Sequence, residues 1–199
     1  MKYLTYYENG EIISTKDYKE AVEKLKKKNR RETVQKFILH KYIFAFCLDE
    51  VEDSSQYSLC KKNGDSLEVY LEKKNVQGNL ICKQREEISE EEGNRILKGE
   101  IEWMNGDERP LVRDFYLQSI LNGLEYSHMM EFEREVYHYE KQDYIVFDRA
   151  IRRKVDHYFL ECLFEDDVQV RVRRAKTIPR YILNMLVNIE PESEQWAYA

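Results

Sequence analysis

The sequence has few residues that interrupt regular secondary structure, with only 7 glycines and 3 prolines among 199 residues. It shows no internal repeat, no low-complexity stretch and no linker rich in proline or glycine. Aromatic residues make up 13% of the chain, which excludes a disordered chain or a collagen-like repeat. A chain of this length can bury a core of its own, so we expect a single domain over residues 1–199.

Long apolar runs are missing as well. The longest extends from Tyr42 to Leu48, far short of the roughly 20 residues of a membrane-spanning helix, and the first residues lack the apolar centre of a signal peptide. The 4 cysteines form no C-x-x-C pair and have no histidine at ligand spacing, which favours reduced structural thiols. We therefore expect a cytoplasmic protein without a transmembrane segment.

Signatures of nucleic-acid binding and of common catalytic sites are also absent. The net charge is −6, so the broad basic footprint of a protein that binds duplex nucleic acid is lacking. No P-loop, dinucleotide-binding loop or G-x-S-x-G motif occurs. Basic residues are nevertheless concentrated over 16–41 and 149–180, which allows a local site for an anionic ligand.

Alternation of polar and apolar residues predicts strands that follow one another closely. A turn at 63–65 joins a strand over 57–62 to one over 67–74, and a turn at 75–78 leads to a strand over 80–87. Further strands are expected at 37–48, 129–139, 143–152, 157–165 and 168–174. Short turns favour antiparallel pairing. We therefore predict an α+β fold, a mainly antiparallel barrel or tunnel with flanking helices. A closed barrel of about eight strands could hold one elongated ligand.

Four helices are expected beside these strands. Thr15 can cap the first, and the second begins at a capping box formed by Ser89 and Glu92. The third begins after Asp107, with Pro110 in its first turn, and ends at Gly123. A last helix is expected over 179–189. The residues of the third helix that should face the core are Leu111, Phe115, Ile120 and Leu121.

Charged side chains fall on strand faces that otherwise look like interior. Arg134, Asp148 and Glu161 each alternate in phase with apolar neighbours. Burying an isolated charge costs roughly several kcal/mol, so each needs a partner. They are either members of structural ion pairs or part of a cation-lined tunnel for a phosphate chain. The arginines at 171–174 are interpreted as the solvated face of an edge strand, in preference to a nucleic-acid contact.

Several of these segments resemble, in order and spacing, the VTC polyphosphate-polymerase domain of the triphosphate-tunnel superfamily, which is found in many bacterial proteins. The resemblance is clearest over residues 56–153. The segments that carry it are LEVYLEKKNVQGNLICKQREEISEEEGNRILKGEIEWM, RPLVRDFYLQSIL, FEREVY, YIVFDRAIR and FLECLFE.

The resemblance implies an antiparallel tunnel that binds ATP or polyphosphate and transfers the γ-phosphate of ATP to a growing polyphosphate chain. It also implies a divalent metal, Mn²⁺ or Mg²⁺, as cofactor. By position, the phosphate-binding residues would be Lys74, Lys83, Arg134 and Arg152, and Glu161 would be the metal ligand. No catalytic residue and no partner protein are assigned.

The sequence departs from the family pattern at places where basic residues are expected. These places hold Ser58, Cys60, Tyr144 and Leu163. Charge-assisted contacts are worth roughly 1.5–3 kcal/mol each, so their loss should weaken phosphate binding. Two interpretations follow. The domain could be a working polymerase in which Arg85, Arg149 or Arg152 fills in, or a catalytically degenerate module for anion binding or assembly. A triphosphate hydrolase of the same superfamily is a further alternative, although its paired-glutamate first strand is not visible. We predict weak anion binding and little or no polymerase turnover.

Overall fold

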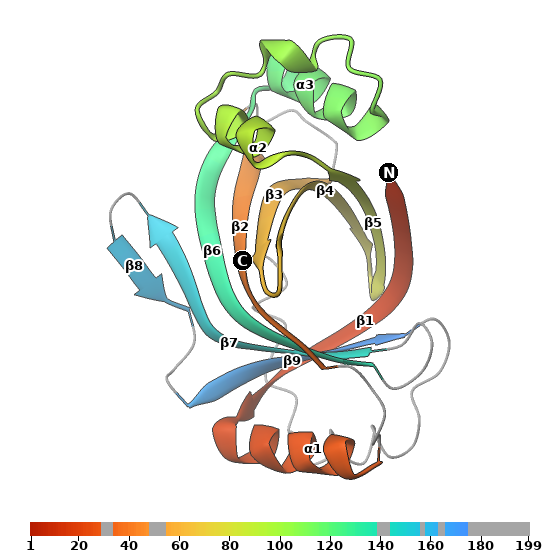
Figure 1. The fold of residues 1–199 in the computed structure, drawn as a ribbon, viewed down its shortest axis with the longest axis vertical. Coiled ribbons are helices and arrows are strands. Elements are labelled where there is room, and N and C mark those ends of the chain that lie inside the picture. The colour runs from red at the N-terminus through yellow and green to blue at the C-terminus, as the bar shows by residue number, and fades with distance from the viewer. Residues whose placement is uncertain (29–33, 48–54, 139–143, 156–157, 163–165, 175–199) are drawn as a thin grey trace.

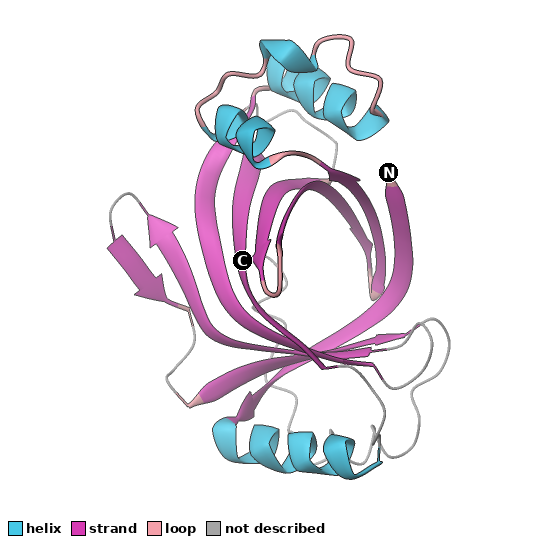
Figure 2. Ribbon diagram, in the orientation of Figure 1, coloured by secondary structure: helices cyan, strands magenta, loops and turns pink. Residues whose placement is uncertain are grey.

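The computed structural model describes residues 1–28, 34–47, 55–138, 144–155, 158–162 and 166–174. Eight of its strands close into an antiparallel barrel (Figures 1 and 2), which confirms the predicted fold class. The strand order is β6-β2-β3-β4-β5-β1-β9-β7, and β7 pairs with β6 to complete the ring, while β8 pairs with β7 outside it. The strands are β1 (Lys2–Ser14), β2 (Val34–Phe46), β3 (Gln56–Asn63), β4 (Leu67–Gln77), β5 (Leu80–Glu87), β6 (Leu124–His138), β7 (Tyr144–Val155), β8 (Tyr158–Glu161) and β9 (Asp167–Arg174).

The β3–β4–β5 meander follows the predicted turns. The second turn contains Gly78 with a φ of 56°, a left-handed conformation that glycine adopts at little cost. On these strands Leu59, Val69 and Leu71 are buried on the outer face of the barrel, under helices. The alternating residues therefore face the barrel interior.

Two strands differ from the prediction, β1 because it was not predicted and β9 because of its place in the sheet. Residues 2–14 form β1, which pairs with both β5 and β9. The interpretation of residues 171–174 as a solvated edge is wrong, because β9 lies between β1 and β7 and Arg173 is 5% exposed. The partner of β9 is at the other end of the chain, so no local pattern could reveal that β9 is an internal strand of the sheet.

Helix α1 (Thr15–Lys28) covers one side of the barrel (Figure 1). Ser14 Oγ accepts a hydrogen bond of 3.1 Å from the backbone N–H of Asp17, so the N-terminal cap lies one residue before the predicted position. The apolar face of α1 packs on β1, β7 and β9, and the ring of Tyr18 meets that of Phe147 edge-on at 5.2 Å.

The opposite side is covered by α2 (Glu90–Leu97), the short 3-10 helix η1 (Glu102–Met104) and α3 (Pro110–Asn122) (Figure 1). The predicted capping box is present at the start of α2. The Ser89 backbone N–H donates to the Glu92 carboxylate at 2.7 Å, and the Glu92 backbone N–H donates to the Ser89 hydroxyl at 3.1 Å.

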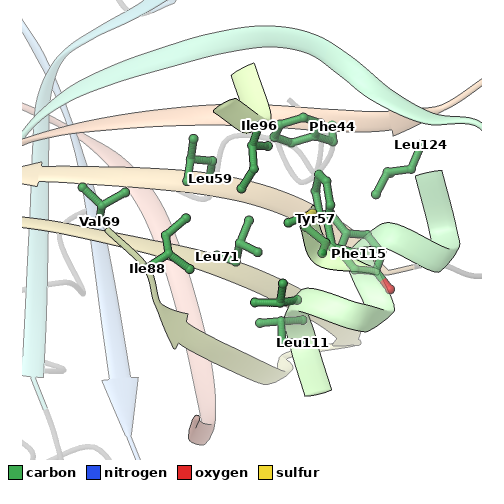
Figure 3. Packing of buried hydrophobic residues seen from close by; sticks show 12 residues of the cluster. Phe44, Tyr57, Leu59, Val69, Leu71, Ile88, Ile96, Leu111, Phe115 and Leu124 are labelled. Carbon is green, nitrogen blue, oxygen red and sulfur yellow. The ribbon is translucent and has the colours of Figure 1, made fainter. Parts of the chain in front are cut away.

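Figure 3 shows the core between these helices and the barrel, where Leu111 and Phe115 are buried as predicted. The prediction was wrong for Ile120 and Leu121, which are 55% and 66% exposed. The rotation of about 100° per residue along an α-helix carries both away from the side that packs on the barrel. Gly123, with a φ of 63°, ends α3 as predicted.

Two sequence predictions fall outside the described residues, namely the helix over 179–189 and the position of Leu163. No helix in the described part of the chain is long and apolar enough to cross a membrane.

Candidate functional site

The barrel interior holds a set of charged side chains that we call the interior charge cluster. They come from every barrel strand except β3. Nine of them form ion pairs with other members, and Lys74 interacts with the other members through longer-range electrostatics. The strand β3 contributes the neutral Ser58 and Cys60, which are 2% and 1% exposed. The members of the cluster are Glu8, Lys41, Glu72, Lys74, Lys83, Arg85, Arg134, Asp148, Arg171 and Arg173.

One half of the cluster is centred on the carboxylate of Glu72, which is 2% exposed. Its Oε1 accepts hydrogen bonds from the Nζ atoms of Lys41 and Lys83, both at 3.1 Å, and its Oε2 accepts one from Nε of Arg85 at 2.8 Å. Burial alone would raise the pKa of Glu72, but these three cations outweigh burial and hold it well below its usual range. Glu72 is therefore ionised at neutral pH.

The other half is centred on Asp148, which is fully buried. Arg134 donates to it through Nε at 2.6 Å and Nη2 at 2.8 Å, and Arg171 forms a second ion pair with the same carboxylate. A two-point pair of this kind fixes the guanidinium plane as well as its position. The interior orientation predicted for Arg134 and Asp148 is thus present, with the two residues paired to each other.

Arg173 and Glu8 join the cluster from β9 and β1 through an ion pair. The Arg173 guanidinium also lies over the rings of Tyr6 and Tyr144, at 5.0 Å and 5.4 Å from their centroids. Tyr144 stands where the family resemblance expects a basic residue, and its register partner on the neighbouring strand is Arg173. Arg173 therefore places a cation next to Tyr144, the position at which the resemblance expects a basic residue.

Lys74 is the member of the cluster with no ion pair among the described residues. Burial lowers its pKa to about 8, and repulsion from Lys41 and Arg171 adds to that effect, while Glu8 and Glu72 only partly offset it. Lys83 shows the same direction, because burial and neighbouring cations lower its pKa despite contact with Glu72. The interior is thus short of negative charge.

The formal charge of the cluster shows this excess of basic over acidic side chains. Seven members are basic and three are acidic, which gives +4 when all are ionised. In a protein whose net charge is −6, positive charge is thus gathered inside the barrel. Such a concentration in a place of low dielectric attracts and orients an anion.

Of the residues predicted to bind phosphate, the structure brings Lys74, Lys83 and Arg134 together and leaves Arg152 apart. Arg152 pairs with Glu131, on the outer side of the barrel. Glu161, the predicted metal ligand, is exposed on β8 and lies opposite Arg152 in register. These two residues neighbour each other outside the interior charge cluster.

A β-bulge in β7 explains the position of Arg152. Ala150 has a φ of 47°, and the register with β6 shifts at this point, so that Glu133 pairs with Arg149 whereas Glu131 pairs with Arg152. In a regular strand Asp148 and Arg152 would lie on the same face. The extra residue inverts the alternation after Ala150, so Arg152 lies on the outer face while Asp148 lies on the inner one.

Five cluster members were not considered for a phosphate site by sequence reasoning: Glu8, Lys41, Glu72, Arg171 and Arg173. Glu8 lies in the unpredicted strand β1, and Lys41 lies in an apolar run. The alternation of Arg171 with Arg173 was a usable signal, because it puts both on one face, but the choice between interior and solvent depended on the neighbours of β9.

The carboxylates of the cluster do not fit a divalent metal. No group of three or more His, Cys, Asp or Glu side chains in the described residues is placed to hold a metal ion. Glu72, Asp148 and Glu8 each bind basic side chains instead. Hard divalent ions need several oxygen ligands that converge on one point, and these oxygens are already engaged at separate places.

Among known proteins, similarity is found only at the level of the three-dimensional fold. No protein-family model and no curated protein matches the sequence. A candidate adenylate cyclase from Bacillus halodurans superposes with a TM-score of 0.63 at 12% identity, over 98% of this chain and 97% of that one. A candidate adenylyl cyclase from Hippeastrum, described as having a dominant triphosphatase activity, gives 0.57 at 10% identity, over 92% and 84%. A chain of the Schizosaccharomyces pombe Mediator head module gives 0.51 at 11% identity, over 93% and 90%.

These similarities show that the chain has the triphosphate-tunnel fold. They show the fold alone, and they do not single out the polyphosphate-polymerase members.

Proposed function

We propose that the barrel interior binds a linear phosphate anion, the triphosphate of a nucleotide such as ATP or inorganic polyphosphate. The observation that carries this proposal is the formal charge of +4 in the interior charge cluster, together with a partly buried Lys74 that has no carboxylate partner in the described residues. A triphosphate brings about four negative charges. Its binding would neutralise the positive charge of the cluster, whose basic side chains repel one another in the barrel interior.

The chemistry of the donors suits phosphate oxygens. Arginine and lysine groups on several strands can each donate to a different oxygen, and the arginines are held in fixed planes by their partners. Donors that are already oriented need little rearrangement when the anion arrives. A chain of phosphates extended through the barrel would contact donors from both halves of the cluster.

We further propose that the domain acts as an anion-binding module, with little phosphoryl transfer of its own. Transfer from ATP relies on metal ions and fixed donors that neutralise the developing charge. Glu72 and Asp148 are surrounded by cations, and the neutral Ser58 and Cys60 hold two buried positions of β3 where the family resemblance expects basic residues. Polyphosphate-polymerase activity is the second candidate, favoured by Lys74, Lys83 and Arg134, which stand at positions that match that family.

Isothermal titration calorimetry with inorganic tripolyphosphate tests the binding proposal. We expect one site per chain, much weaker binding of orthophosphate, and at least a roughly tenfold loss of affinity in Lys74→Gln. Lys73→Gln is the matched control, because Lys73 is adjacent but pairs with Asp114 under α3. No binding by the wild type, or equal losses in the two variants, would contradict the proposal.

A second assay separates binding from catalysis. The protein is incubated with ATP and Mn²⁺, and the products are examined on a gel for polyphosphate. We expect no polymer; abundant polymer would favour the polymerase candidate. Arg152→Gln and Glu161→Gln, assayed in the same titrations with and without Mn²⁺, test the roles that the sequence resemblance assigns to these two residues.

A further inference from the structure

Glu72 has a place in the interior charge cluster that differs from those of the other two carboxylates. It contacts three cations from two other strands, Lys41 on β2, beyond β3, and both Lys83 and Arg85 on the adjacent β5, at 2.8–3.1 Å. Asp148 contacts two cations and Glu8 one. Glu72 therefore engages more of the available donors than either of the other acidic members.

The arrangement around Glu72 resembles that of a bound phosphate group. A carboxylate and a phosphate both present acceptor-only oxygens to N–H donors. One oxygen of Glu72 receives two lysines and the other an arginine, so the donors already converge on a small anionic group. A phosphate could use the same three donors only if the carboxylate moved away or lost its charge.

We infer that Glu72 is a built-in competitor for the bound anion, whose carboxylate occupies, in the empty barrel, donors that an entering phosphate group needs. The inference rests on the proposed function and deepens it. Its consequence is selectivity. A small anion gains too little to replace a carboxylate held by three donors, whereas a linear polyanion adds the contacts of further phosphates elsewhere in the cluster.

Lys74 supplies the position at which a polyanion can begin to bind. It lies two residues from Glu72 on the same face of β4, and it has no ion pair with any described residue. A first phosphate can therefore bind at Lys74 without displacing a carboxylate. The following phosphate then reaches the donors around Glu72.

The test compares Glu72→Gln with the wild type by calorimetry at pH 7, using tripolyphosphate and orthophosphate as separate probes. The variant removes the competing charge and keeps the shape of the side chain. We expect tripolyphosphate to bind at least about tenfold more tightly to the variant, and orthophosphate binding to become measurable.

Glu135→Gln is the matched control. Glu135 is another buried glutamate, 3% exposed, that contacts two cations, Lys36 at 2.8 Å and Arg149 at 3.4 Å, but on the outer face of the barrel. Its loss should change neither affinity. Equal gains in both glutamine variants would show an unspecific effect of net charge and would overturn the inference.

A double variant keeps the test decisive if Glu72→Gln does not fold. Glu72→Gln combined with Lys83→Met keeps the formal charge of the cluster at +4 and frees Lys41 and Arg85, so tripolyphosphate should bind at least as tightly as to the wild type. If Glu72 only orients the cations, both variants bind more weakly, which would refute the competitor role while wild-type binding still supports the proposed function. If neither the wild type nor any variant binds, both the proposed function and this inference fail. If the Glu72 variants bind tripolyphosphate and the wild type does not, the inference is supported, but the wild type lacks the proposed function.

Discussion

Replacing Lys74 by methionine should make the protein more stable while it weakens anion binding. Lys74 is partly buried without an ion pair in the described part of the barrel, and its pKa is about 8 instead of 10.5. A tenfold change in proton affinity is worth about 1.4 kcal/mol, so keeping this lysine charged costs the folded state up to roughly 3 kcal/mol at pH 7. Methionine fills similar space without a charge, so Lys74→Met should recover much of that energy.

The pH dependence distinguishes this explanation from an effect of packing. Between about pH 8 and pH 10.5 the unfolded chain keeps the proton on Lys74 and the folded chain does not. The unfolded state then binds more protons, so the stability of the wild type rises with pH relative to the variant. The advantage of Lys74→Met should therefore be largest at pH 7 and should nearly disappear by pH 10.5.

Urea denaturation of both proteins at pH 7, 8.5 and 10 measures this difference in the free energy of unfolding. Lys73→Met is the control. It removes the ion pair with Asp114 at 3.1 Å and a contact with the Tyr57 ring, so it should destabilise the protein by about 1 kcal/mol. A Lys74→Met variant that is less stable than the wild type, or a gain that stays constant from pH 7 to pH 10, would refute the reasoning.

Three further predictions follow from the same structure. Tripolyphosphate binding at pH 8.5 should take up protons, because the anion raises the lowered pKa of Lys74, and calorimetry in buffers of different ionisation enthalpy should detect this uptake; heat that is independent of the buffer would count against it. In thermal or urea unfolding, Phe115→Ala should cost about 3–5 kcal/mol, whereas Leu121→Ala should stay within about 0.5 kcal/mol, and similar losses would contradict the described packing of α3. Ser89→Ala should lower stability by about 1 kcal/mol through loss of the capping box, and an unchanged unfolding midpoint would argue against that cap.

Local sequence patterns were sufficient to predict the structural features that depend only on residues close together in the sequence. The alternation in β4 places Glu72 and Lys74 on one face, and the capping box marks the start of α2. The glycine-containing turns fix the meander. Lys74, Lys83 and Arg134 were assigned through the family resemblance, which depends on the order and spacing of such segments.

The remaining features depend on partners that are distant in the sequence or on local irregularities. Arg171 and Arg173 point into the barrel only because β1 and β7 flank β9. Arg152 faces outward because of the bulge at Ala150, and no property of an alanine announces a φ of 47°. Glu8 lies in a strand whose mixed composition shows no period, and its position follows from pairing with β9 at the opposite end of the chain.

The pairing of β1 with β9 has a consequence for how the protein is made. Glu8 and Arg173, which form one of its ion pairs, lie 165 positions apart, and β9 is the last described strand of the barrel. A ribosome must therefore release most of the chain before the ring can close. Until β9 pairs with them, β1 and β7 each have one backbone edge partly exposed to other nascent chains. Such long-range pairings slow folding and lengthen the period of aggregation risk, so the yield of native protein should depend on the rate of translation and on chaperones that shield unpaired strands.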